Sequence, residues 1–156
     1  MNTMITGALF KEMIQLMQSF PIDESRIHLR LMQADTVFDD GKLRLTPIPT
    51  RHLEDLNRPS YAYLLRADGK TALFTGDLSG HLAKGDFPAP AQDMELDALI
   101  CEMAHFSPEE VLPYLRARRA KRIYFTHVYP LDKLSVIEQL TGILNIPVRA
   151  VAEALD

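Results

Sequence analysis

Two unbroken apolar segments on either side of a helix-like segment constrain the fold of this chain most strongly. Residues 96–103 (LDALICEM) and 121–128 (KRIYFTHV) lack the alternation of apolar and polar residues that marks a half-exposed strand. Between them, residues 107–110 (SPEE) form a helix-start pattern, with serine as N-cap, proline at the first position and glutamate three residues after the cap. This order predicts an α/β fold in which both strands are buried in one sheet.

The remaining pattern adds a hairpin and further helices. Asp68 and Gly69 separate two apolar runs, residues 60–68 and 70–76, which predicts a β-hairpin. Pro113 is expected to kink or shift the helix that starts near residue 107. The other expected elements are a helix over 4–20, strands over 26–32 and 42–49, a long loop over 78–95, a helix with one apolar face over 130–144 and a short closing strand.

Composition indicates one domain of an ordinary globular type. The chain has 156 residues, which we divide into an N-terminal helix and linker (1–25) and a region of sheet and helices (26–156). The net charge of −4 disfavours a dedicated nucleic-acid binder, and the basic run 116–122 is interpreted as a solvated helix end, with phosphate contact as the alternative. Cys101, the single cysteine, is expected in the core. With no leader-like or membrane-spanning segment in the sequence, we expect a cytoplasmic protein without a membrane partner.

Three residues with metal-ligand side chains follow apolar strands. His52 follows the strand expected over 42–49, Asp77 follows "ALFTG", and His127 follows "RIYFT". Singly, each has an ordinary explanation, because Gly-Asp is a common turn and a histidine after a strand is often idle. Ligand sites collect at strand ends in α/β folds, so together the three favour a shared metal or catalytic site. Their spacing alone names no metal.

Two segments resemble a known family. Residues 46–80 (TPIPTRHLEDLNRPSYAYLLRADGKTALFTGDLSG) and 98–128 (ALICEMAHFSPEEVLPYLRARRAKRIYFTHV) resemble the second half of the metallo-β-lactamase-fold hydrolases. The resemblance implies that His52, Asp77 and His127 are metal ligands. It further implies that Asp77 bridges two metal ions, commonly zinc, with His52 on one ion and His127 on the other.

The chain departs from that family at its diagnostic motif. His-x-His-x-Asp-His, which supplies four ligands, is absent, and the five histidines lie far apart in the sequence, at positions 28, 52, 81, 105 and 127. We therefore expect the C-terminal half of an αββα sandwich, a mixed sheet with helices packed on one face. With three of seven ligands, the isolated chain is expected to bind zinc weakly or not at all, and no residue is assigned as catalytic.

Two functions follow from this half-fold. The first is the C-terminal portion of a metal-dependent, zinc-type hydrolase that is incomplete and inactive alone. The alternative is a non-catalytic module that homodimerises or associates with a partner chain supplying the missing N-terminal half. Two nearby residues leave alternatives open: Glu102 either orients a ligand or meets an unrelated buried partner, and His105 is either a helix-entry loop residue or a supporting group.

Overall fold

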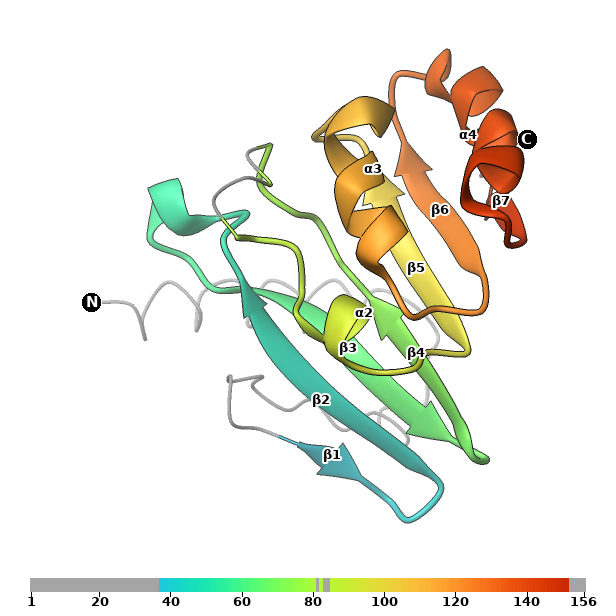
Figure 1. The fold of residues 1–156 in the computed structure, drawn as a ribbon. Coiled ribbons are helices and arrows are strands. Elements are labelled where there is room, and N and C mark those ends of the chain that lie inside the picture. The colour runs from blue at the N-terminus through green and yellow to red at the C-terminus, as the bar shows by residue number, and fades with distance from the viewer. Residues whose placement is uncertain (1–36, 81, 83–84, 152–156) are drawn as a thin grey trace, which may run out of the picture. The chain divides into compact units, whose positions relative to one another are not determined.

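The computed structural model describes residues 37–80, 82 and 85–151, which form one seven-stranded sheet with its strands side by side in chain order (Figure 1). The strands are β1 (Phe38–Asp39), β2 (Leu43–Thr50), β3 (Ser60–Ala67), β4 (Lys70–Phe74), β5 (Ala98–Met103), β6 (Ile123–Val128) and β7 (Val148–Ala150). The helices are η2 (Glu54–Leu56), α2 (Pro90–Asp93), α3 (Pro108–Ala117) and α4 (Lys133–Leu144). The helix expected over 4–20 and the strand expected over 26–32 lie outside the described residues.

The sheet is mixed, as expected, and changes direction at β4. Strands β1 to β4 pair antiparallel, whereas β4 to β7 pair parallel. The β3–β4 connection confirms the predicted hairpin, because Asp68 and Gly69 both have the positive φ angles, 49° and 69°, that a tight two-residue turn requires. Of the predicted ligands, Asp77 follows β4 and His127 lies in β6 of the parallel half, whereas His52 follows β2 of the antiparallel half.

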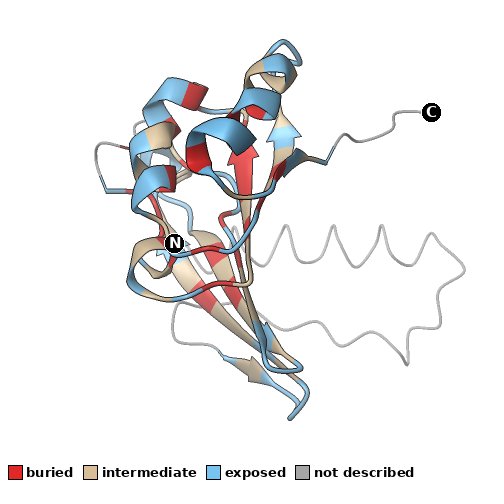
Figure 2. Ribbon diagram, turned by 45° about the vertical axis from the view of Figure 1, so that its right-hand side comes forward, coloured by how far each residue is buried: buried red, intermediate tan, exposed pale blue. Residues whose placement is uncertain are grey.

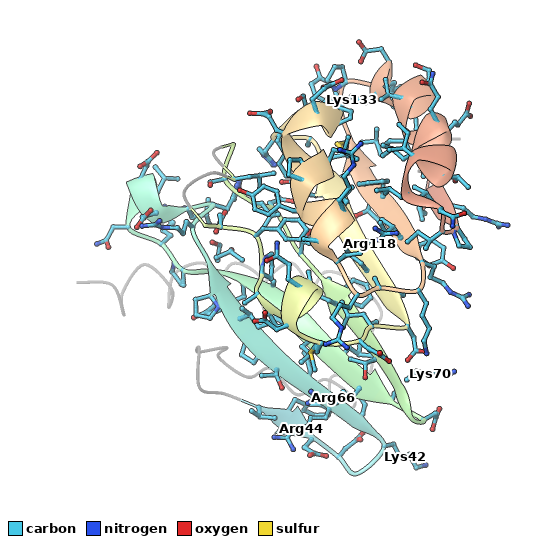
Figure 3. The ribbon with its side chains drawn as sticks, viewed as in Figure 1. Lys42, Arg44, Arg66, Lys70, Arg118 and Lys133 are labelled. Atoms are coloured by element: carbon cyan, nitrogen blue, oxygen red, sulfur yellow. The ribbon has the colours of Figure 1, made fainter. Side chains whose placement is uncertain are left out.

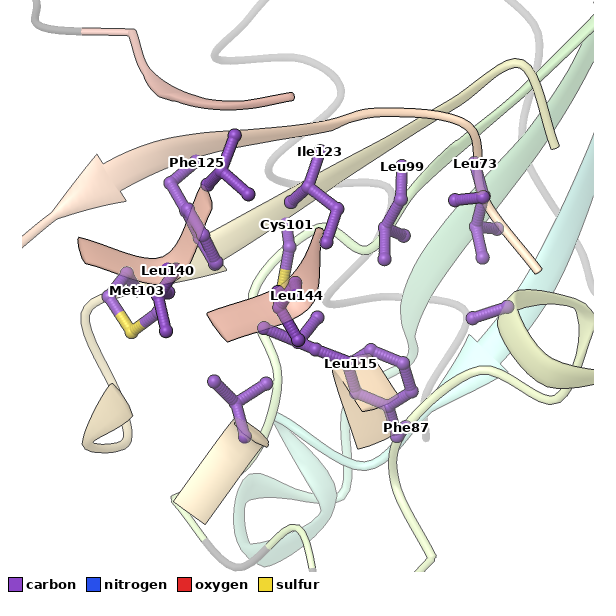
Figure 4. Packing of buried hydrophobic residues seen from close by; sticks show 14 of the residues in the cluster. Leu73, Phe87, Leu99, Cys101, Met103, Leu115, Ile123, Phe125, Leu140 and Leu144 are labelled. Carbon is purple, nitrogen blue, oxygen red and sulfur yellow. The ribbon is translucent and has the colours of Figure 1, made fainter. Parts of the chain in front are cut away.

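The core lies between one face of the sheet and the helices. A row of paired residues crosses β3 to β7 on this face, and all are buried: Leu64, Leu73, Leu99, Ile123 and Val148. They belong to one apolar cluster with Ala91 of α2, Leu115 of α3 and Leu140 of α4 (Figures 2 and 4). Cys101 is fully buried in the same cluster, as predicted.

The opposite face of the sheet is only partly covered. Tyr63, Phe74, Ile100 and Tyr124 form the neighbouring paired row, and each keeps part of its surface accessible, with Phe74 39% exposed. The expectation that residues 96–103 are buried on both faces therefore holds on this side at Glu102, which is buried, and not at Ile100, which is half-buried. The physical reason is that α2, α3 and α4 all contribute to the cluster on the other face, and η2 buries no residue.

The helices follow the predicted pattern, with differences at Pro113 of α3, at the apolar face of α4 and in the loop that contains α2. The Ser107 capping box is present in α3, which continues through Pro113 to its end at residue 117. Helix α4 buries Ile137 and Leu140 but leaves Ile143 49% exposed, so the predicted apolar face is narrower than expected. The loop expected over 78–95 contains the short helix α2, which has a proline in its first turn and is too short for a periodic signal.

The basic run 116–122 makes contacts within the chain. Arg118 donates to the Leu115 carbonyl at the end of α3 and to the Leu144 carbonyl at the end of α4 (Figure 3). Burial lowers the pKa of the Arg118 guanidinium below its ordinary value. Within the described residues, no helix is long and apolar enough to cross a bilayer.

Candidate metal centre

His52 lies just beyond β2, where a buried carboxylate holds the chain. The Arg51 amide donates to Asp86 Oδ1 at 2.6 Å, and the Ser79 amide donates to Asp86 Oδ2 at 2.6 Å. Asp86 therefore ties the segment before His52 to the segment after Asp77. The His52 ring pairs through Nδ1 with the Leu78 carbonyl at 3.1 Å, and since a carbonyl can only accept, Nδ1 carries the proton. The lone pair is then on Nε2.

Asp77 follows a position that only glycine fits well. Gly76 has a φ of +60°, and a Cβ built on it would lie 2.7 Å from the Tyr61 carbonyl oxygen. The Gly-Asp sequence at the end of β4 is thus explained by a left-handed turn under a close backbone contact. This turn presents the Asp77 carboxylate at the same end of the sheet as His52.

His127 occupies an irregularity of β6. Glu102 pairs with Thr126 and Met103 with Val128, so His127 is an extra residue in the ladder between β5 and β6. Its φ of 48° is unusual for a residue other than glycine. Bulges of this kind redirect a side chain at functional sites. Here the His127 ring reaches the other two predicted ligands.

The structure brings the three predicted residues together although 75 positions separate the first from the last. His127 Nδ1 lies 3.1 Å from Asp77 Oδ1, and His52 Nε2 lies 3.9 Å from Asp77 Oδ2. Asp77 therefore stands between the two histidines, with one oxygen toward each. That these residues bind metal remains a prediction.

Two further residues belong to the cluster, and the sequence interpretation gave them less weight. The His105 ring lies between the other two rings, 4.6 Å from His52 and 5.5 Å from His127. Ligand-type atoms of His52, Asp77 and His105 lie within 4.8 Å of one another, as do those of Glu102, His105 and His127. The sequence feature that could have identified both residues is a glutamate, Glu102, at the end of an expected buried strand, with a histidine three residues later.

The donor set fits a divalent metal of the zinc type. Imidazole nitrogens and a carboxylate oxygen are the usual zinc ligands in sites without cysteine. Burial raises the pKa of the Cys101 thiol above its ordinary value, and this fully buried residue belongs to neither group of clustered ligand atoms. A cleft of about 250 Å³ opens beside the cluster, lined by Arg51, His52, Glu54, Asp55, Ser79, Gly80 and His105.

Comparison with solved structures decides the fold. The metallo-β-lactamase fold protein YhfI from Bacillus subtilis superposes with a TM-score of 0.57 at 18% identity, covering 77% of this chain and 51% of that one. Igni18, a metallo hydrolase from Ignicoccus hospitalis, gives 0.59 at 12% identity, covering 88% and 61%. The described chain has a metallo-β-lactamase fold. No family model matches the sequence, and no curated protein matches it.

The metallo-β-lactamase fold is matched in part. The chain spans about half the length of YhfI, and 32% of CmlA, a diiron β-hydroxylase from Streptomyces venezuelae, which superposes with a TM-score of 0.52 at 11% identity over 74% of this chain. At such identities the likeness shows the fold alone. Because CmlA is described as a diiron protein and Igni18 only as a metallo hydrolase, the metal of this chain is argued from its own residues.

Proposed function

We propose that this chain is a portion of a zinc-dependent hydrolase and that His52, Asp77 and His127 are metal ligands. The observation that carries the proposal is the position of the Asp77 carboxylate between two histidine rings at the edge of the sheet. The partial metallo-β-lactamase fold supports it, because several proteins with this fold are described as metal-dependent hydrolases.

The residues of the chain would have simple roles in such a site. When bound, zinc acts as a Lewis acid and makes water a nucleophile at neutral pH. The Leu78 carbonyl keeps His52 in the tautomer whose Nε2 faces Asp77. The cleft beside His52 gives a substrate ester, amide or phosphodiester access to the cluster. No side chain of this set is assigned as a nucleophile.

We further propose that catalysis needs residues that the described chain does not supply. The four ligands of His-x-His-x-Asp-His are absent from the sequence, so a two-metal site would have to be completed by residues outside it. Buried Cys101 in its free form is compatible with a cytoplasmic location.

Zinc retention tests the proposal. The purified chain, equilibrium-dialysed against a low-micromolar zinc buffer, should hold more zinc than Asp77→Ala, whereas Asp93→Ala, which removes an exposed carboxylate from α2, should match the unmodified chain. Equal zinc in the unmodified chain and Asp77→Ala would overturn the metal assignment.

Hydrolysis of bis(p-nitrophenyl) phosphate should be no faster for the chain than for Asp77→Ala. Zinc-dependent turnover lost in that variant would show that the chain alone completes its site.

A second candidate is a non-catalytic half-fold that associates with a copy of itself or with a partner chain. The partly exposed row of Tyr63, Phe74, Ile100 and Tyr124 favours it, because this apolar sheet face is the surface that a second layer would cover.

A further inference from the structure

His105 lies in the loop at the entry to α3, as one of the two sequence interpretations had it, and its ring lies beside the other histidines of the cluster. It follows β5 and lies in the short connection to α3, where its ring contacts both His52 and His127. Its ring is 32% exposed, so one edge remains accessible from the cleft. Among the contacts within the described chain, its ring nitrogens make one hydrogen bond, through Nδ1. The other ring nitrogen, Nε2, has no hydrogen-bond partner among the described residues.

Glu102 saturates its own acceptor positions in holding this histidine. The Glu102 side chain is 2% exposed. Its Oε1 accepts from the Leu78 amide at 2.8 Å and from His105 Nδ1 at 2.9 Å. Its Oε2 accepts from the amides of Ala104 at 2.7 Å and His105 at 3.1 Å. A carboxylate has about four lone-pair positions. All are used, so Glu102 is a positioning residue rather than a ligand.

The Glu102 contact determines which nitrogen of His105 is available. Because the Glu102 oxygens accept, His105 Nδ1 donates, and the lone pair of the neutral ring is on Nε2. Metal-bound histidines usually donate their other N–H to a carboxylate or carbonyl, which fixes the ring and raises its basicity. His105 and His52 both show this arrangement, through Glu102 and the Leu78 carbonyl respectively.

The loop that carries His105 is held from two sides. Lys133 at the start of α4 donates from Nζ to the carbonyls of Met103 at 2.9 Å, Ala104 at 3.2 Å and Phe106 at 2.8 Å (Figure 3). On the other side, a Cβ built on Gly80 would lie 2.9 Å from the His105 carbonyl oxygen, so the loop after Asp77 packs directly on it. The ring is therefore placed before any ion arrives.

We propose that His105 is a metal ligand and that His52, Asp77 and His105 hold one divalent ion on this chain without help from a partner. The inference rests on the proposed metal-binding function; it adds His105 as a ligand and makes His127 the partner of Asp77 Oδ1 rather than a ligand of this ion. Asp77 Oδ1 pairs with His127, which leaves Oδ2 facing His52 for the ion. Three protein ligands and a water are the usual complement of a catalytic zinc. From three family ligands we expected weak or absent zinc binding. With His105 as a further ligand, we expect instead that each chain binds one ion.

Cobalt binding tests this assignment. The full chain is titrated with Co²⁺ followed by visible absorption, and zinc affinity is obtained by competition. We expect one ion per chain, with affinity lowered more than about tenfold in His105→Ala and Asp77→Ala, and by about 10- to 100-fold in Glu102→Gln, the range known for outer-shell partners. Glu95→Gln, which changes an exposed carboxylate paired with Arg119, is the matched control and should leave affinity unchanged. Added imidazole should restore the cobalt spectrum of His105→Gly.

The outcomes separate the inference from the function on which it rests. No ion bound by the unmodified chain would overturn both. An ion that requires Asp77 but is bound equally well by His105→Ala would overturn the ligand role of His105 and leave the metal site intact. If the Glu102 variant fails to fold, ¹⁵N spectra of the histidine rings in the unmodified chain give the answer. Zinc should shift the resonance of His105 Nε2 while Nδ1 stays protonated. An unshifted Nε2 resonance would contradict the proposal.

Discussion

Gly76 resolves a steric conflict at the point where β4 passes into the loop carrying Asp77. The backbone there has a φ of +60° and lies against the Tyr61 carbonyl of β3. Both conditions exclude a side chain, the first by conformational preference and the second by contact. The position of the Asp77 carboxylate therefore depends on the absence of a side chain one residue earlier.

Gly76→Ala should lower the free energy of unfolding by about 1 to 3 kcal/mol or more, through left-handed strain and displacement of the Tyr61 carbonyl. Urea denaturation followed by circular dichroism measures the change. Two controls separate the causes. Gly41 has a φ of +84° and no atom near an added Cβ, so Gly41→Ala reports conformational strain alone. Gly142 in α4 has open space around an added Cβ, so Gly142→Ala should raise the free energy of unfolding by about 0.5 to 1 kcal/mol. A Gly76→Ala protein no less stable than Gly41→Ala would contradict the close contact.

Asp97 joins three strands at the end of the sheet opposite the metal centre. It lies just before β5, accepts from the Thr71 amide of β4 at 2.9 Å and from Lys121 Nζ, just before β6, at 2.9 Å. The Lys121 hydrogen bond, followed by the Thr71 amide, lowers the pKa of Asp97 from 3.8 to about 2. The carboxylate is therefore bound more tightly when it is ionised.

The stabilisation from Asp97 should be present above about pH 4 and should be lost as the pH falls toward 2, because protonation is harder in the folded than in the unfolded chain. In Asp97→Asn the fall in stability over this interval should be smaller than in the unmodified chain. Urea midpoints at pH 2.5 and pH 5 give the comparison, with Asp93→Asn as the exposed control. Equal pH dependence in the unmodified chain and Asp97→Asn would show that the Asp97 hydrogen bonds to Thr71 and Lys121 do not contribute to the pH dependence of stability.

Local sequence signals predicted the elements that depend on near neighbours. The Asp68-Gly69 hairpin and the Ser107 capping box are set by two to four adjacent residues, and both are confirmed. The place of His105 could not be obtained in this way, because its loop is held by Lys133 of another helix and packs against Gly80 of a distant loop. The three strand-end residues were identified from type and position, but their separations in space required the fold.

In the described part of the chain, the sheet has one face closed by helices and one face that is only partly covered. Leu73, Leu99 and Ile123 are fully buried beneath the helices, whereas their strand neighbours Phe74 and Ile100 are not. Apolar burial contributes roughly 25 cal/mol per Å², so covering this second face is worth several kcal/mol. We propose that another copy of the chain or a partner covers it.

Light scattering coupled to size-exclusion chromatography should give a mass above the 17.7 kDa of one chain. Phe74→Lys should lower that mass toward a monomer, because it places a charge at the centre of the apolar row. Ile143→Lys, at an exposed position on α4, is the matched control and should leave the mass unchanged. A stable monomer of the unmodified chain that binds no hydrophobic dye would contradict association through this face.

The bulge at His127 allows the proposed metal site to be tested by comparing homologous sequences. A residue with a side chain held at a φ of 48° carries conformational strain of about 1 to 3 kcal/mol, which asparagine reduces and glycine removes. A descendant that had ceased to bind metal would therefore gain stability by drifting to asparagine or glycine at this position. Persistence of histidine at this position across diverged homologues would indicate continued selection for metal binding. Replacement by asparagine or glycine would indicate the branches in which metal binding was lost.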